Sequence, residues 1–487
     1  MAGISIRLEK LIKDESYISN FTGYLITTFA VAGPWIITII VLSIFSSLFS
    51  AELRVSADFQ LFNATVVYGF IGSQLITVPF QFIVTRYIAD EIYRNRTDFL
   101  RATFTGMLKV IFVIGAILSG FLFFRSDLPL YYQVLASYFL IMVSFVWISS
   151  FFISALGDYT YLGKSFIVGS IVGFVTFALV SQISYLFSYS VTITGLLMMV
   201  SSMTTIFIMI CYKFMTSIDK SNQCQFDFIR SFSNYSSLFY IGVFYILGLW
   251  IDKFLMWGSK ISLNVLDVLY VAPAYDQASF LSNLLIIPSN VLFLSLVEVE
   301  FIKFYKDYFK KTADGTYIEI ERARILMKKE LLRKILQIFI IQSVIVMFIY
   351  VFTYDIFSIL KYDVLSKMIF TNLLPGLTFY IFVLLSIIMF LYFEERMKAL
   401  FTSLGFFIAN LSFTLFYINQ GHESYGKGFT IASIVVSIYA LFALISMLNN
   451  VNYRLFGVKT VTTKKRKKYF ETIADNLRIK KGVELDE

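Results

Sequence analysis

The chain has 487 residues, of which 58% are hydrophobic and only 15% are charged, whereas a soluble domain is about 25% charged. With a mean hydropathy of +0.76, it has too few polar residues to cover a water-exposed surface of that size. These values exclude a secreted enzyme, a nucleic-acid-binding domain and a disordered tail as descriptions of the bulk of the chain. They predict an all-α polytopic membrane protein.

About twelve apolar runs are long enough to cross the hydrocarbon core, which takes about 20 residues of helix. They lie near residues 20–49, 59–85, 103–124, 131–156, 163–185, 190–214, 232–258, 276–298, 335–359, 367–393, 398–419 and 426–449.

The positive charges are distributed unevenly between the two sides of the membrane that this span count implies. With the N-terminus inside, 34 of the 41 Lys and Arg residues fall on the inner side and seven on the outer side. Inner loops of membrane proteins are rich in Lys and Arg. The pattern predicts a multi-pass protein of the cell membrane with both termini in the cytoplasm. The net charge of +9 therefore indicates orientation, and no nucleic-acid partner is expected.

The spans and the polar segments between them predict a domain organisation with two six-helix lobes around a central cavity. The tail has a run of basic residues next to the membrane, which predicts binding to anionic lipids. The long inner loop is expected to form a helical hairpin on the membrane surface. The predicted segments are an amphipathic cytoplasmic helix at 1–19, an N-lobe at 20–214, a cytoplasmic linker at 215–231, a C-lobe at 232–449 with its cytoplasmic loop at 299–334, and a basic cytoplasmic tail at 450–487.

An internal repeat supports the two lobes. Pro79 in the second span and Pro288 in the eighth are 209 residues apart. The same offset pairs the carboxamides Gln74 with Asn283 and Gln81 with Asn290. Residues seven apart lie on one face of a helix, so each half is expected to carry an amide face beside a proline. Related halves are common in membrane carriers.

The amide faces have two interpretations, which the sequence leaves open. Carboxamides both donate and accept hydrogen bonds, which suits sugar hydroxyls and acetamido groups. They also hold neighbouring spans together. Prolines in the spans are expected to kink the helices; they are Pro34, Pro79, Pro288 and Pro375.

Charged residues at or inside the spans complete the predicted substrate path, because charge inside a membrane is costly. We expect Lys109 and Asp252 to face a water-filled cavity, and Arg86 and Glu300 to reach the interface or to pair locally. The full set of charged candidates is Arg86, Lys109, Asp252, Asp276, Glu298 and Glu300.

The chain offers little for catalysis or metal binding. His422 is its single histidine, and Cys211 and Cys224 are its two cysteines. Neither a zinc site nor a disulfide framework is expected from them. The sequence predicts a transporter without cofactor, metal or catalytic residues, and not an enzyme.

Several segments together resemble the PelG family, the inner-membrane exporters of the Pel exopolysaccharide system. They are Met1–Ile4 with Leu8, Lys10 and Leu11, then Gly33–Trp35, Arg86–Asp90, Trp250–Lys253, and the run Pro273–Phe301.

The resemblance implies a twelve-helix fold of the multidrug/oligosaccharidyl-lipid/polysaccharide (MOP) superfamily. It implies export of a partly deacetylated N-acetylhexosamine polymer during biofilm matrix synthesis. The implied partners are a PelF-like cytoplasmic glycosyltransferase and PelD-like and PelE-like membrane subunits that respond to cyclic di-GMP. The amines of such a polymer would be attracted by acidic residues beside the amide face, such as Asp252 and Asp276.

Other functions stay open from the sequence. A flippase for lipid-linked oligosaccharides would use Arg86, Lys109 and Lys164 to hold a pyrophosphate. An ion-coupled drug antiporter would need an isolated carboxylate deep in the first six spans, which the sequence lacks. A polytopic membrane enzyme and a structural subunit of a synthase are the remaining alternatives.

Overall fold

The computed structural model describes residues 56–124, 127–183, 189–218, 224–360, 362–457 and 472. The predicted amphipathic helix at 1–19, the first span with Pro34, and most of the basic tail lie outside these residues.

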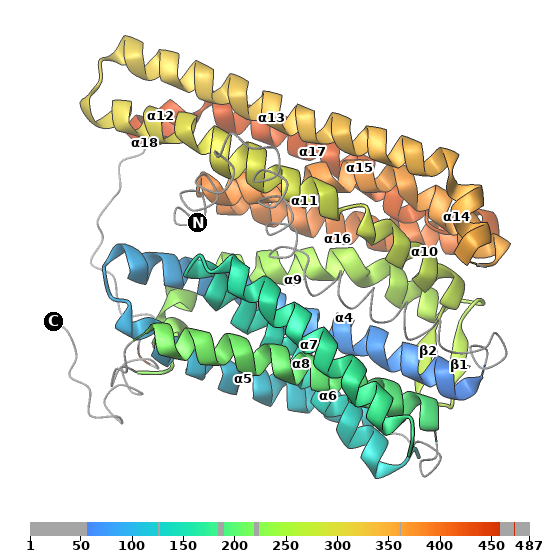
Figure 1. The fold of residues 1–487 in the computed structure, drawn as a ribbon. Coiled ribbons are helices and arrows are strands. Elements are labelled where there is room, and N and C mark those ends of the chain that lie inside the picture. The colour runs from blue at the N-terminus through green and yellow to red at the C-terminus, as the bar shows by residue number, and fades with distance from the viewer. Residues whose placement is uncertain are drawn as a thin grey trace, which may run out of the picture.

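The N-lobe consists of helices that share one apolar core. Figure 1 shows them together in blue to green. They are α4 (Ala57–Tyr93), α5 (Asp98–Phe123), α6 (Leu130–Ala155), α7 (Tyr159–Val180) and α8 (Ser190–Ser217).

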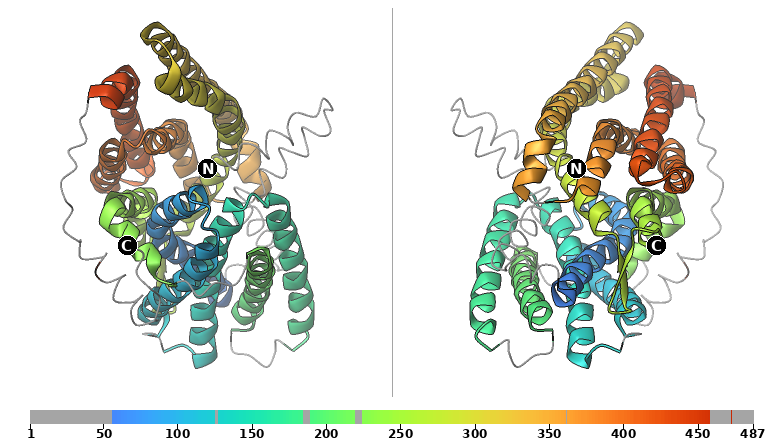
Figure 2. Two further views of the ribbon diagram at one scale, coloured as in Figure 1. Left: turned by 90° about the vertical axis from the view of Figure 1, so that its left-hand side faces the viewer. Right: turned by 90° about the vertical axis from the view of Figure 1, so that its right-hand side faces the viewer.

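The C-lobe has a second core. Figure 2 shows its yellow-to-red helices above the blue-to-green N-lobe in views from both ends of the molecule. Its first elements are η2 (Asp227–Ile229), α9 (Arg230–Trp257), β1 (Leu263–Val265), β2 (Leu269–Val271), α10 (Pro273–Leu284), α11 (Ile287–Phe293) and the π-helical η3 (Leu294–Phe301). The remaining elements are α12 (Ile302–Asp314), α13 (Tyr317–Val351), α14 (Thr353–Leu360), α15 (Val364–Tyr392), α16 (Arg396–Ile418), η4 (His422–Ser424), α17 (Lys427–Asn449) and α18 (Val451–Gly457).

Eleven helical segments of the described chain are long and apolar enough to cross a membrane. They coincide with the second to the twelfth predicted spans. Strands β1 and β2, which form a short antiparallel hairpin, are the only sheet within the described residues. The prediction of an all-α polytopic membrane protein is therefore confirmed.

The two lobes pack their helices in the same pattern. In the N-lobe, α8 contacts α6 and α7, and α6 contacts α4. In the C-lobe, α17 contacts α15 and α16, and α15 contacts α10. The prediction of two related lobes is confirmed by these neighbour relations.

The two helices that carry the proline repeat differ in continuity. Helix α4 continues through Pro79 without interruption. The corresponding helix of the C-lobe is broken into α10 and α11 between Leu284 and Ile287, just before Pro288. At the break the amides of Leu285 and Ile286 bond three residues back instead of four, and a proline next to this turn has no amide proton to restore the regular pattern. The repeated prolines therefore have different local effects.

The segment 299–334 contains a helical hairpin whose arms continue the adjacent spans. Helix α12 ends at Gly315, and α13 starts after Thr316, which forms a capping box with Glu319. Helix α13 then continues without a break to Val351. We expected a helical hairpin on the membrane surface here; the structure has a hairpin, and its arms continue directly into the bundle.

All spans run between the same two ends of the molecule, which we call the basic end and the hairpin end. The basic end includes the α12–α13 turn, Arg94, Arg230 and Arg396, and the hairpin end includes β1 and β2 (Figure 1). Charged residues that terminate the spans gather mainly at the basic end.

Candidate functional site: the seam between the lobes

The lobes meet along a seam in which α4 of the N-lobe lies against α9 of the C-lobe. Ile71 and Ile83 of α4 belong to the C-lobe core. Val265, Leu269 and Val271 of the β-hairpin belong to the N-lobe core. Each lobe therefore contributes apolar side chains to the other.

At the middle of the seam the two backbones approach closely. A Cβ atom placed on Gly242 of α9 would lie 2.8 Å from Cα of Pro79 and 2.8 Å from the carbonyl oxygen of Val78. Such distances are too short for a methyl group, so this contact requires glycine at position 242. The proline that marks the repeat in the sequence is thus also a point of close contact between the lobes.

A buried hydrogen bond crosses the seam nearer the hairpin end. The indole N–H of Trp250 donates to the side-chain oxygen of Gln74 over 3.0 Å. The exposed fractions of Trp250 and Gln74 are 2% and 6%. The amide oxygen of Gln74 therefore bonds to a helix of the other lobe. This agrees with the interpretation that the carboxamides hold neighbouring spans together.

Aromatic contacts extend the seam to the hairpin end. The rings of Tyr68 and Trp257 stack with centroids 4.4 Å apart. The Tyr68 hydroxyl donates to the carbonyl oxygen of Tyr270 in β2 over 2.8 Å. The indole N–H of Trp257 donates to both carboxylate oxygens of Asp276, each at 3.1 Å.

Beside these aromatic residues lies a cluster of buried charges. The hydroxyl of Tyr275 donates to Oδ2 of Asp252 over 2.5 Å. Lys253 interacts electrostatically with both Asp252 and Asp276, and its Nζ lies 4.1 Å from the ring centroid of Trp250. Oδ1 of Asp252 is buried and has no hydrogen-bond partner among the described residues. Two carboxylates therefore lie within electrostatic range of one lysine.

This cluster differs from an open, water-lined path. The exposed fractions of Asp252 and Lys253 are 3% and 5%. Asp252 and Asp276 are both predicted path residues, and in the structure both interact electrostatically with Lys253. In this conformation the hairpin, Trp257 and Trp250 enclose them.

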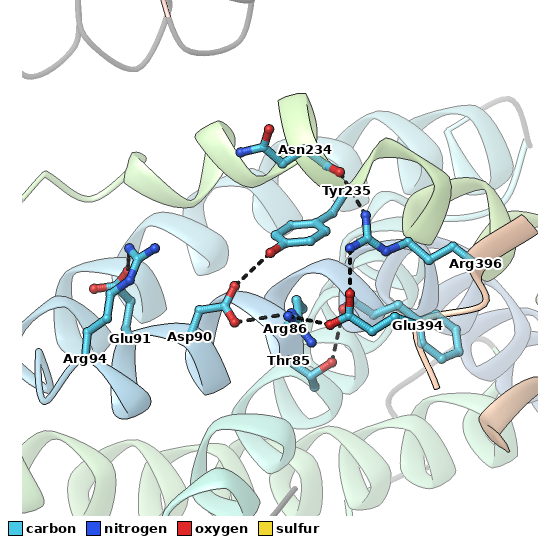
Figure 3. A network of polar contacts seen from close by, with 10 residues as sticks. Thr85, Arg86, Asp90, Glu91, Arg94, Asn234, Tyr235, Glu394 and Arg396 are labelled. Atoms are coloured by element: carbon cyan, nitrogen blue, oxygen red, sulfur yellow. Dashed lines mark hydrogen bonds and ion pairs between the residues drawn. The ribbon is translucent and has the colours of Figure 1, made fainter. Parts of the chain in front are cut away.

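An ion network closes the basic end of the seam (Figure 3). Arg86 of α4 bridges Asp90 at 3.2 Å and Glu394, in the turn between α15 and α16, at 2.8 Å. The hydroxyl of Tyr235 on α9 donates to Asp90 over 3.2 Å. Arg396 pairs with Glu394 at 3.4 Å. The network thus links the N-lobe to two separate segments of the C-lobe.

Tyr235 is central to this network. Two guanidinium groups lie near its ring, with the centroid 5.4 Å from Cζ of Arg86 and 4.5 Å from Cζ of Arg396. Arg396 also donates to the backbone carbonyl of Asn234 over 3.0 Å. Sequence reasoning selected Arg86 but missed Tyr235, Glu394 and Arg396, because their shared position arises only from helix packing.

A cavity of about 250 Å³ adjoins the network at the same end. It lies between the end of α4, η2 and the first turns of α9. Asp90 and Tyr235 line the cavity and also belong to the ion network.

The other predicted path residues are dispersed. Gln81, Asn283 and Asn290 are partly buried. Lys109 is exposed on α5, and its Nζ donates to the side-chain oxygen of Gln225 over 2.7 Å, so it lies away from the seam. Glu300 pairs with Lys334 of α13. The side chain of Glu298 lies outside what the structure describes.

Comparison with solved structures places this fold among transporters. The chain is similar to a point mutant of the Vibrio cholerae MATE transporter VcmN, with a TM-score of 0.62, 13% identity, and 93% and 100% of the two chains covered. It is similar to a MATE transporter in a bent conformation, with a TM-score of 0.59, 14% identity, and 93% and 97% covered. A MOP superfamily transporter from Pyrococcus furiosus gives a TM-score of 0.55, 14% identity, and 88% and 96% covered. At these identities the likeness shows the fold alone.

Sequence comparison shows the family. No curated protein matches the chain significantly. The model of the PelG family, described as an exopolysaccharide exporter (EPS-E), matches residues 1–456. The chain therefore belongs to the PelG family, on a two-lobed fold shared with MATE and other MOP superfamily transporters.

Proposed function

We propose that this membrane transporter exports a Pel-type exopolysaccharide, a partly deacetylated N-acetylhexosamine polymer made by a PelF-like cytoplasmic glycosyltransferase. The family match over residues 1–456 supports export of a polysaccharide. PelD-like and PelE-like subunits that respond to cyclic di-GMP would complete the complex.

The basic end faces the cytoplasm in this proposal. Loops on the cytoplasmic side of membrane proteins are rich in Lys and Arg. Arg94, Arg230 and Arg396 lie at this end, whereas the β-hairpin lies at the other. The nascent polymer would therefore meet the network around Arg86 and Tyr235 first.

The observation that carries the mechanism is the seam itself. Two lobes with separate cores meet along α4 and α9, with polar contacts at both ends and a close backbone contact at Gly242. Transporters of repeated lobes alternate access by moving one lobe as a rigid body against the other. Movement that separates the ends of the seam would expose Gln74, Asp252 and Asp276 to a substrate. Their carboxamide and carboxylate groups suit the hydroxyls and amines of a partly deacetylated polymer.

The experiment is a secretion assay in the native host. A deletion strain is complemented with the wild-type gene, with a variant combining Asp252→Asn and Asp276→Asn, or with Asp314→Asn, whose exposed carboxylate at the end of α12 serves as the control. Secreted and intracellular polymer are measured at equal protein levels. We expect the deletion and the double variant to lose secretion and the control to retain it. Normal secretion from the deletion strain would overturn the proposed function.

The flippase alternative gains no support from the geometry. Arg86 is neutralised by two carboxylates, and Lys109 is bonded to Gln225. Lys164 is exposed on α7. These three cations do not converge on one pyrophosphate site.

A further inference from the structure

The cavity at the basic end is small and half-open, and two helices and a 3₁₀ turn line it with several charged side chains. Its volume is about 250 Å³, below the roughly 300–1,000 Å³ of pockets that enclose drug-sized ligands. The side chains that line it include Tyr87, Glu91, Arg94, Asp227, Arg230 and Tyr235. A single small ring is the size of ligand that such a space accommodates.

Glu91 carries an unsatisfied acceptor in the wall of this cavity. Only 4% of its surface is exposed. Its Oε1 accepts a hydrogen bond from Arg94 over 3.2 Å. Its Oε2 is buried and has no partner among the described residues. A buried carboxylate oxygen without a donor is costly, so a hydroxyl group of a ligand in the cavity would relieve this cost by donating to it.

The charges of the cavity wall are already paired. Arg94 bridges Glu91, and Arg230 bridges Asp227 at 3.3 Å. Asp90 pairs with Arg86 and accepts from Tyr235. The lining holds three arginines, Arg94, Arg96 and Arg230, against the three carboxylates of Asp90, Glu91 and Asp227. The wall therefore has no surplus of positive charge that would favour a polyanion. It offers closely spaced donors and acceptors instead.

Two tyrosines add flat apolar surface to this polar wall. Tyr87 is buried, and its hydroxyl lies 3.5 Å from Oδ2 of Asp227. The ring of Tyr235 contacts the guanidinium groups of Arg86 and Arg396. Alternating donors and acceptors beside aromatic rings match a neutral ring that carries several hydroxyl groups.

We propose that this cavity binds one hexose-sized saccharide unit, with a sugar hydroxyl donating to Oε2 of Glu91. The assignment rests on the proposed export function, because it identifies the ligand as a unit of the exported polymer. Asp90 and Tyr235 belong both to the cavity and to the ion network. A sugar bound there contacts Asp90 and Tyr235, which help to hold the basic end of the seam closed. Binding of the sugar is therefore coupled to the opening of this end.

The test measures binding to the purified full-length protein in detergent. Saturation-transfer NMR and competition titrations use N-acetylhexosamine, hexosamine and hexose monosaccharides and short oligomers, with inorganic phosphate and pyrophosphate as anionic probes. We expect saccharides to bind and the anions neither to bind nor to compete. Binding of phosphate or pyrophosphate without binding of any saccharide would overturn the assignment.

Three variants locate the site. Glu91→Gln removes the carboxylate acceptor while keeping the shape, and we expect saccharide binding about tenfold weaker or more. Asn234→Trp adds bulk at an exposed position in the cavity rim and is expected to block binding without altering a buried group. Glu330→Gln is the matched control, because Glu330 also pairs with an arginine three residues on, at 3.3 Å, but on α13.

The outcomes separate this site from the function of the whole protein. Unchanged saccharide binding in both Glu91→Gln and Asn234→Trp would overturn the site, even if the deletion strain loses secretion. Normal secretion in the deletion strain would overturn the export function, whereas saccharide binding that depends on Glu91 would still identify the ligand of the cavity.

Discussion

Trp250 and Gln74, which lie 176 residues apart in the chain, form a buried hydrogen bond between the two lobes. The bond is 3.0 Å long and joins the indole N–H to the amide oxygen. It ties a residue of the repeated amide face to the helix that carries the buried charges. Movement of the lobes at this level has to break it.

Loss of this bond is expected to lower thermal stability. Trp250→Phe leaves Oε1 of Gln74 buried without a donor, which costs about 1–3 kcal/mol. Adding Gln74→Leu removes the unsatisfied oxygen and is expected to restore part of the loss. The measurement is thermal unfolding of the detergent-purified protein. Trp147→Phe is the control, because Nε1 of Trp147 has no hydrogen-bond partner among the described residues; an equal loss there would contradict the prediction.

The contact at Gly242 gives a second prediction. Gly242→Ala places a methyl group 2.8 Å from Cα of Pro79 and forces α4 and α9 apart. We expect strongly reduced polymer secretion at an unchanged protein level. Gly405→Ala on α16 is the matched control, because nothing lies within 4 Å of its added Cβ. If both substitutions had the same effect, the close contact would not matter for transport.

The pair formed by Arg86 and Glu394 predicts a charge-swap rescue. Both side chains are partly exposed, at 37% and 52%, and such pairs add about 0–1 kcal/mol to stability. Arg86→Glu or Glu394→Arg alone is therefore expected to reduce secretion severalfold with little change in melting temperature. Combining the two restores the opposite charges of this pair and is expected to recover part of the secretion, because the swap also places like charges beside Asp90 and Arg396.

A control pair tests whether the network is special. Asp307 and Lys311 form an exposed ion pair on α12 at 3.7 Å. Charge reversal of either residue is expected to leave secretion unchanged. If the combined Arg86 and Glu394 variant stayed as impaired as the single variants, pairing across the seam would not explain the defect.

The buried cluster predicts a strong effect of removing its cation. Lys253→Met leaves Asp252 and Asp276 buried without an ammonium group, which costs about 3–5 kcal/mol for a buried charge that has lost its partner. Adding Asp276→Asn is expected to recover much of this loss. Unfolding temperature and the yield of folded protein are measured beside Lys310→Met, which changes an exposed lysine on α12. A single variant as stable as the wild type would show that the cluster is not ionised as a unit.

Much of the architecture follows from local sequence. Long apolar runs predict spans because each backbone polar group inside lipid has to be satisfied within the helix. The repeat of Pro79 and Pro288 with their flanking amides predicts two related lobes. The predicted spans from the second to the twelfth coincide with helices of the structure.

The site was only partly predictable. Asp252, Asp276, Gln74 and Arg86 were selected because polar groups inside spans are costly and have to serve a purpose. Glu394, Tyr235 and Glu91 were not, because charges and tyrosines at helix ends are ordinary. What distinguishes them is which helix ends lie next to one another, and this depends on packing between residues far apart in the chain.

The sequence by itself determined the membrane class, the family and the number of lobes, since composition and periodicity act locally along the chain. Only the tertiary structure decided that Gln74 bonds to Trp250, that Asp252 and Asp276 both lie within electrostatic range of Lys253, and that a cavity lies beside Glu91. These contacts join separate segments of the chain, because they arise where α4, α9, α10 and η2 pack against one another.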